Sequence, residues 1–233
     1  MIDQQSDTHS NDASDLSLRT HRRLIGYLGF LLPFLVYLLS GLRPTNGLPR
    51  WHFLHSISAY YYTGAVAVFV GILFALALFL FSYRGYTTSI ADRVIGRIGG
   101  TAALGVAICP TKAPDAVTPP SWWHPALGVI HLVSASVLFI AFILFALWLF
   151  RKSSQTNRKN RPNDKKVRDM IYLGCAVIMM GAIGWATASI FTGAPIFWQE
   201  TAAIEGFAIS WLVKGEAHAP AVRAIRNLRA LRM

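Results

Sequence analysis

Charged side chains are scarce in this chain of 233 residues: they make up 14% of the sequence, while hydrophobic residues make up 54%. A soluble domain of similar length draws roughly a quarter of its residues from the charged types, because these cover its surface. The mean hydropathy of +0.42 also lies on the apolar side. The composition therefore excludes an ordinary soluble domain and predicts an integral membrane protein.

Cysteine and cofactor-binding motifs are also sparse. The two cysteines, Cys109 and Cys175, form neither a CxxC pair nor a metal-ligand spacing, so we interpret both as small packing residues. The sequence holds no glycine-rich phosphate loop, catalytic-triad motif or cofactor fingerprint. We therefore expect no cofactor, and no nucleotide chemistry of the kind found in soluble enzymes.

Acidic residues are outnumbered by basic ones: the sequence has 11 Asp and Glu against 22 Lys and Arg, which gives a formal charge of +11. Such a charge is typical of nucleic-acid-binding proteins, but here the basic residues flank apolar segments and no soluble fold presents them. We therefore expect no nucleic-acid partner. The predicted partners are the lipid bilayer itself and anionic lipids at its cytoplasmic face.

Long apolar segments are what the sequence has in abundance. A helix needs about 20 residues to cross the hydrocarbon core of a bilayer, because it rises about 1.5 Å per residue. Six segments approach or exceed this length, at 24–42, 60–81, 94–109, 128–150, 171–191 and 196–213. The predicted fold is all-α, an integral membrane bundle of six transmembrane helices that forms one domain over residues 24–213.

The basic residues also predict how the bundle is oriented. Six crossings with both termini on one side leave only Arg43, Arg50 and Lys112, of the 22 basic residues, on the opposite side. Because Lys and Arg accumulate in cytoplasmic loops, both termini are predicted to be cytoplasmic. Residues 1–23 are predicted to be a disordered tail, and residues 214–233 a basic amphipathic tail at the membrane surface.

Several polar and ionisable side chains fall within or at the ends of the apolar segments, where a charge costs several kcal/mol unless it is paired, protonated or beside water. Segments two, four and six all enter the bilayer from the outer side in this topology. Their polar side chains are therefore predicted to share a cavity in the outer half of the bilayer. The candidate binding residues are His55, Ser58, Tyr62, His131, Glu200 and Glu205.

Three functions fit such a cluster. In the leading hypothesis, a small non-enzymatic membrane protein binds a lipid or a small solute in the cavity, and a buried carboxyl carries a proton. The alternative is a metal-dependent intramembrane lipid hydrolase with His131 and Glu200 as ligands, although no HxxxH or HExxH motif is present. In the third hypothesis, the cluster is a hydrogen-bond network that only holds helices together in a structural or assembly protein.

The order of short motifs resembles that of bacterial six-helix membrane families without an assigned activity, which are distantly similar to the DRAM-like (damage-regulated autophagy modulator) proteins. The matching features are Ser56, Ser58 and the tyrosines 60–62 at the entry to the second segment, Pro110 after the third, and His131 in the fourth. The resemblance implies six helices and a multi-pass protein of the bacterial cytoplasmic (inner) membrane, and it implies no reaction.

The ceramidase-like membrane hydrolases are similar in using intramembrane histidines together with an acidic residue and a serine. This sequence lacks their paired histidines on one late helix and has Glu200 and Glu205 there instead. It also has six predicted helices rather than seven. We therefore keep the hydrolase only as the alternative.

Overall fold

The computed structural model describes residues 3–45, 47–83, 90–152 and 163–216. The secondary structure assigned within these ranges is entirely helical, which confirms the all-α prediction. The six α-helices are α1 Asp3–Leu42, α2 Val66–Ser82, α3 Ile90–Ile108, α4 Pro125–Leu144, α5 Asn163–Thr192 and α6 Phe197–Lys214. A 3-10 helix, Ser58–Tyr62, precedes α2, and a π-helical turn, Phe145–Leu149, continues α4.

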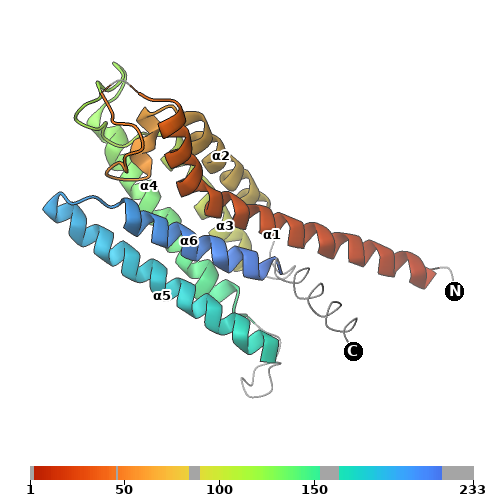
Figure 1. Cartoon of the computed structure of the whole chain (residues 1–233). Coiled ribbons are helices and arrows are strands. Elements are labelled where there is room, and N and C mark those ends of the chain that lie inside the picture. Colours follow the sequence, from red (N-terminus) through yellow and green to blue (C-terminus); the bar gives the residue numbers. More distant parts are fainter. Residues whose placement is uncertain (1–2, 46, 84–89, 153–162, 217–233) are drawn as a thin grey trace, which may run out of the picture.

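The helices pack side by side as a bundle, and the amino-terminal part of α1 extends well beyond it (Figure 1). Successive helices in the order α5, α6, α1, α2, α3 and α4 pack against one another around the bundle. The π-helical turn after α4 contacts α5, and α4 also contacts α6. The ring is thereby closed, and its inner faces leave room for an interior site.

Local sequence explains where two of these helices begin and end. The ring of His124 accepts a hydrogen bond from the backbone N–H of Ala126 at 3.2 Å, and Pro125 occupies the first position of α4. A side-chain cap and a proline without an N–H both suit a helix start. The helix α5 stops where Gly193 takes a φ of +71°, a left-handed conformation that favours glycine.

Within the described residues, three helices are long and apolar enough to cross a membrane: Ser17–Leu42, Pro125–Leu149 and Asn163–Thr192. The outer face of α5 exposes large apolar side chains. Phe191, Met170 and Trp185 are 86%, 68% and 65% exposed. An apolar surface of this kind suits contact with lipid. By length and composition, these helices suggest a helical membrane protein.

The first two helices differ from their predicted bounds. The helix α1 begins at Asp3 rather than at residue 24, so residues 3–23 are helical and not the disordered tail that was predicted. His21 and Arg23 explain part of this difference, because they bond to the carbonyls of Phe79 and Gly215 at 2.9 and 2.8 Å. Such contacts to other helices stabilise the last turns of a segment whose composition alone suggested disorder.

The second helix was predicted to start at residue 60, but α2 starts at Val66. The tyrosines belong to the 3-10 helix, which ends where Thr63 adopts an extended backbone with φ −122° and ψ 175°. The Thr63 hydroxyl then accepts the N–H of Ala65 at 3.1 Å, which competes with a continuous helix. Tyr62 and His55 therefore do not share one face of an α-helix.

The other predicted segments correspond to α3, α4, α5 and α6 with shifted ends. The largest shift is at α5, which begins at Asn163 instead of residue 171 because the polar stretch before the apolar run is helical too. The predicted amphipathic tail falls largely on residues 217–233, which lie outside the described residues.

Candidate functional site

A narrow cavity lies inside the ring of helices, between α1, α2, α3, α4 and α6. It holds about 540 Å³ of space between atoms, counted out to its open mouth, and 15 residues line it. Thirteen of these are apolar, and the two polar ones are Ser58 and Glu200. The lining of the cavity is therefore apolar except at Ser58 and Glu200.

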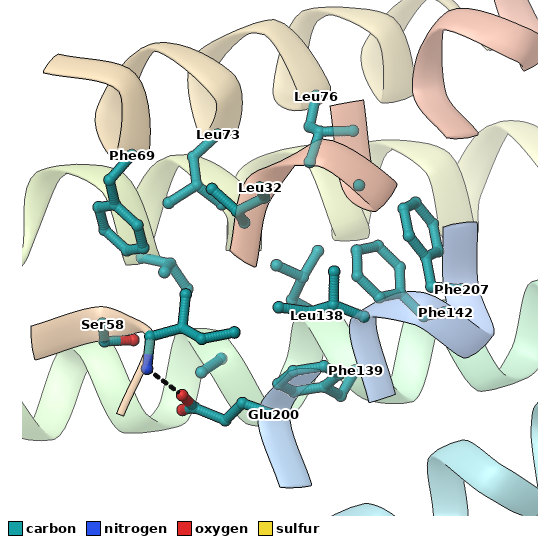
Figure 2. A pocket seen from close by; sticks show the side chains of 15 residues that line it. Leu32, Ser58, Phe69, Leu73, Leu76, Leu138, Phe139, Phe142, Glu200 and Phe207 are labelled. Carbon is teal, nitrogen blue, oxygen red and sulfur yellow. Dashed lines mark hydrogen bonds between the residues drawn. The ribbon is translucent and has the colours of Figure 1, made fainter. Parts of the chain in front are cut away.

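The two polar residues lie towards one end of the lining, where Phe69 and Phe139 are close to them (Figure 2). Figure 2 shows Ser58 and Glu200 together at one end, and Phe142 and Phe207 towards the other. The rings of Phe142 and Phe207 stack there with centroids 3.5 Å apart. Glu200 and Phe207 are seven residues apart on α6, so the cavity extends about 10 Å along the bundle.

At the polar end, Ser58 and His131 form a hydrogen-bonded pair. The Ser58 Oγ atom lies 2.8 Å from Nε2 of His131, and Nδ1 of the same ring lies 2.6 Å from the carbonyl oxygen of Cys109. A carbonyl oxygen only accepts, so Nδ1 carries the proton and donates it. Nε2 is then the acceptor for the Ser58 hydroxyl. His131 is buried and Ser58 is half-buried.

Glu200 fixes the turn that carries Ser58. Its Oε2 atom accepts a hydrogen bond from the backbone N–H of Ile57 at 2.6 Å, drawn as the dashed line in Figure 2. On the other side of the same turn, the Ser56 hydroxyl accepts the N–H of Ala59 at 3.1 Å. The backbone before and after Ser58 is thus held by side chains, which sets the position of its hydroxyl.

The start of α6 is tied to the same segment. The backbone N–H of Ile196 donates to the carbonyl of His55 at 2.7 Å, and the His55 ring lies 3.2 Å from the carbonyl of Gly193. These two contacts hold the α5–α6 connection against residues 55–57. They explain why Glu200, one turn into α6, meets Ile57.

The six candidate residues separate into two groups. Ser58, His131 and Glu200 come together at the polar end, as described above. Tyr62 is not among the lining residues, and its hydroxyl donates to the carbonyl of Thr111 at 2.6 Å. His55 is exposed and faces the Gly193 carbonyl rather than the cavity.

Glu205 lies outside the cavity lining. Five residues separate it from Glu200, which turns it by about 140° around α6. Both of its carboxyl oxygens are buried, and they have no hydrogen-bond partner among the residues that the structure describes. The carboxyl is therefore an uncompensated polar group on another face of α6.

The described residues offer no cluster of three or more His, Cys, Asp or Glu side chains placed to hold a metal ion. A catalytic zinc site uses three protein ligands. Both ring nitrogens of His131 are engaged by Ser58 and by the Cys109 carbonyl. The geometry of this part of the chain therefore gives the metal-dependent hydrolase no ligand set.

Sequence reasoning missed the backbone groups of the site. The Cys109 carbonyl and the Ile57 N–H orient His131 and Glu200, and neither has a sequence signal, because every residue carries such groups. The apolar body of the cavity was missed as well. Most of its lining consists of leucine, isoleucine and phenylalanine. The same residues fill a core without a cavity, so the sequence does not distinguish the two.

Comparison with known proteins adds no relative: no family model, no curated protein and no solved structure matches this chain. The resemblance to DRAM-like proteins stays a prediction. Any function must therefore be argued from the site itself.

Proposed function

We propose that this chain is a six-span protein of the bacterial cytoplasmic membrane, with both termini cytoplasmic, and that it binds the acyl chain of a lipid in the cavity. The proposal needs α2, α3 and α6 to cross the bilayer as well as the three longer helices. These three have 17, 19 and 18 residues. They are therefore about 26 to 29 Å long, close to the thickness of a hydrocarbon core of ~30 Å.

Charged contacts at one end of the bundle support the proposed topology. Glu216, just after α6, pairs with Arg19 of α1 at 2.9 Å and with Arg168 of α5 at 3.4 Å. Lys152, after α4, pairs with the buried Asp92 at the start of α3 at 3.3 Å. The starts of α1, α3 and α5 therefore meet the ends of α4 and α6 at one end of the bundle. This arrangement is expected of the basic, cytoplasmic side of a membrane.

The observation that carries the binding proposal is the division of the cavity into a polar end and an apolar body. An acyl chain fits the apolar body, where Leu73, Leu138 and Phe207 offer contacts and no hydrogen-bonding group competes. The carbonyl end of the same molecule then lies beside Ser58 and Glu200. A small polar solute would not match this lining, because most of its own hydrogen-bonding groups would face apolar side chains.

Filling the cavity tests the proposal. Leu138 lines the cavity and is 6% exposed, whereas Leu132, on the same helix, is 54% exposed and faces away from the interior. We expect Leu138→Trp to abolish saturable binding of tritiated palmitate to the detergent-purified protein, and Leu132→Trp to leave it unchanged. Monodisperse elution and a cooperative thermal transition show that each variant is folded.

Two results would contradict the proposal. One is a folded wild-type protein that neither retains lipid in native mass spectrometry nor binds palmitate saturably. The other is a Leu138→Trp variant that binds palmitate as tightly as the wild type does. Leu73→Trp, from the opposite wall on α2, provides a second variant if Leu138→Trp is not folded.

A further inference from the structure

The Ser58 hydroxyl has three features that the binding of a lipid does not require. Among the lining residues that the structure describes, it is the only hydroxyl that faces the cavity. It is hydrogen-bonded to an imidazole nitrogen at 2.8 Å. The backbone on either side of it is clamped by Glu200 and Ser56.

His131 has the orientation that a general base needs. Its Nδ1–H donates to the Cys109 carbonyl at 2.6 Å, which fixes both the tautomer and the plane of the ring. The lone pair of Nε2 therefore points at the Ser58 hydroxyl. A nucleophile, a base in contact with it and a third group that orients the base are the arrangement that activates a serine.

The accessibilities of the two groups also suit this arrangement. His131 is 5% exposed and lies behind Ser58, so a ligand in the cavity meets the hydroxyl before it meets the ring. A chain that runs from Phe207 towards Ser58 would bring its carboxyl carbon to the polar end. A base shielded from bulk solvent and a nucleophile at the cavity wall are thus both present.

We propose that Ser58 is a nucleophile and His131 its general base in the cleavage of carboxylic esters of long-chain lipids. This inference rests on the proposed function, since the acyl chain must enter the cavity. It differs from the metal-dependent hydrolase because it uses no metal, and His131 is a base rather than a ligand.

The reaction balances with water as the second substrate. The Ser58 Oγ atom forms a bond to the acyl carbon while its proton moves to Nε2 of His131. The ester C–O bond breaks, and the leaving alcohol oxygen takes that proton. Water then attacks the acyl-serine, its proton passes through Nε2 back to Ser58 Oγ, and a free fatty acid leaves. Serine and histidine end as they began.

Glu200 acts as a positioning residue in this scheme, because it holds the Ile57 N–H next to the nucleophile and does not contact the reacting hydroxyl. Glu200→Gln keeps an oxygen acceptor for that N–H and is expected to retain most of the activity. Glu200→Ala removes the acceptor, and the rate should fall with no change in which serine reacts.

The experiment uses the full chain in detergent with two probes. A long-chain alkyl fluorophosphonate reports a reactive serine, and mass spectrometry locates the modified residue. Methylumbelliferyl palmitate reports turnover by fluorescence. We expect labelling at Ser58, turnover by the wild type, and loss of both in Ser58→Ala. Ser136→Ala is the matched control, because that hydroxyl lies on α4, is not among the lining residues, and donates to the Leu132 carbonyl of its own helix.

His131→Gln separates catalysis from packing. Glutamine keeps a side-chain oxygen to accept from Ser58 and an amide to donate to the Cys109 carbonyl, but it cannot take up a proton at neutral pH. We expect labelling and turnover to fall by about 100-fold or more, the range that general-base catalysis contributes. His124→Asn, which keeps a helix cap at the start of α4, should retain the wild-type rate.

The outcomes distinguish this inference from the proposed function. Saturable palmitate binding with neither labelling nor turnover overturns the nucleophile and leaves lipid binding in place. Absence of binding, labelling and turnover in folded protein overturns both. Labelling at another serine, or a His131→Gln variant as fast as the wild type, also overturns the inference, because Ser58 and His131 would then serve packing alone.

Discussion

Removing the carboxyl of Glu200 should loosen the contact between α6 and the Ser58 turn. The Glu200 Oε2 atom and the Ile57 N–H are 2.6 Å apart and join positions separated by 143 residues in the sequence. A hydrogen bond contributes about 0.5–1.5 kcal/mol net, and its deletion also leaves a part-buried N–H without an acceptor, which costs about 1–3 kcal/mol. We therefore expect Glu200→Ala to lower the free energy of unfolding by about 2–3 kcal/mol.

Glu200→Gln is the matched comparison, because the amide oxygen still accepts from Ile57. It should cost about 1 kcal/mol or less, since the hydrogen bond to the Ile57 N–H is retained. Unfolding in mixed micelles by titration with sodium dodecyl sulfate, followed by tryptophan fluorescence, measures both. Asp115→Ala controls for loss of a carboxylate, since the Asp115 side chain is 96% exposed.

Two results would refute the reasoning. One is a Glu200→Ala variant that unfolds within about 0.5 kcal/mol of the wild type, which is the scatter expected of an unimportant surface change. The other is a Glu200→Gln variant as unstable as Glu200→Ala, which would mean that the charge rather than the accepting oxygen fixes the turn. Palmitate binding measured on the same samples then shows whether the turn also shapes the cavity.

Three further predictions concern the rest of the bundle. Gly96→Ala should destabilise the protein by about 1–3 kcal/mol, because a Cβ there would lie 2.7 Å from the Leu80 carbonyl oxygen. Gly181→Ala, which has open space around it, should be neutral or stabilising. The dodecyl sulfate titration described above measures both variants. Glu205→Met should raise the unfolding temperature in detergent, since it removes a buried carboxyl that has no partner among the described residues; an unchanged or lower temperature would argue that Glu205 is solvated or paired. In intact cells, and in a chain with Cys109 and Cys175 changed to serine, a membrane-impermeant maleimide should label Asp115→Cys and spare Asn163→Cys. The reverse pattern would invert the proposed topology.

The sequence predicted the helical class well, because a bilayer allows few ways to satisfy the backbone and therefore leaves long apolar segments as a signature. It predicted helix starts poorly. The tyrosines before α2 are apolar enough to extend the predicted helix, but Thr63 adopts an extended backbone and its hydroxyl bonds locally. Residues 3–23 contain no glycine or proline, so they suit a helix once contacts such as that of His21 with Phe79 hold them.

Depth in the membrane was enough to suggest that Ser58, His131 and Glu200 lie at one level. It was not enough to tell which residues at that level face one another, because rotation about a helix axis also decides contact. Glu205 has a suitable residue type and depth, yet it lies about 140° around α6 from Glu200. The backbone partners at Cys109 and Ile57 follow only from the packed structure.

The end of the bundle that carries the ion pairs bears on what the cavity does. Below the stacked Phe142 and Phe207, Trp211 is fully buried, and its ring lies 4.9 and 5.1 Å from those of Tyr83 and Phe145. Its indole nitrogen is buried and has no hydrogen-bond partner among the described residues. A solute that crossed the membrane here would have to part these rings. The cavity is therefore closed towards the charged end of the bundle, which favours a ligand that enters and leaves at one end, as a lipid does.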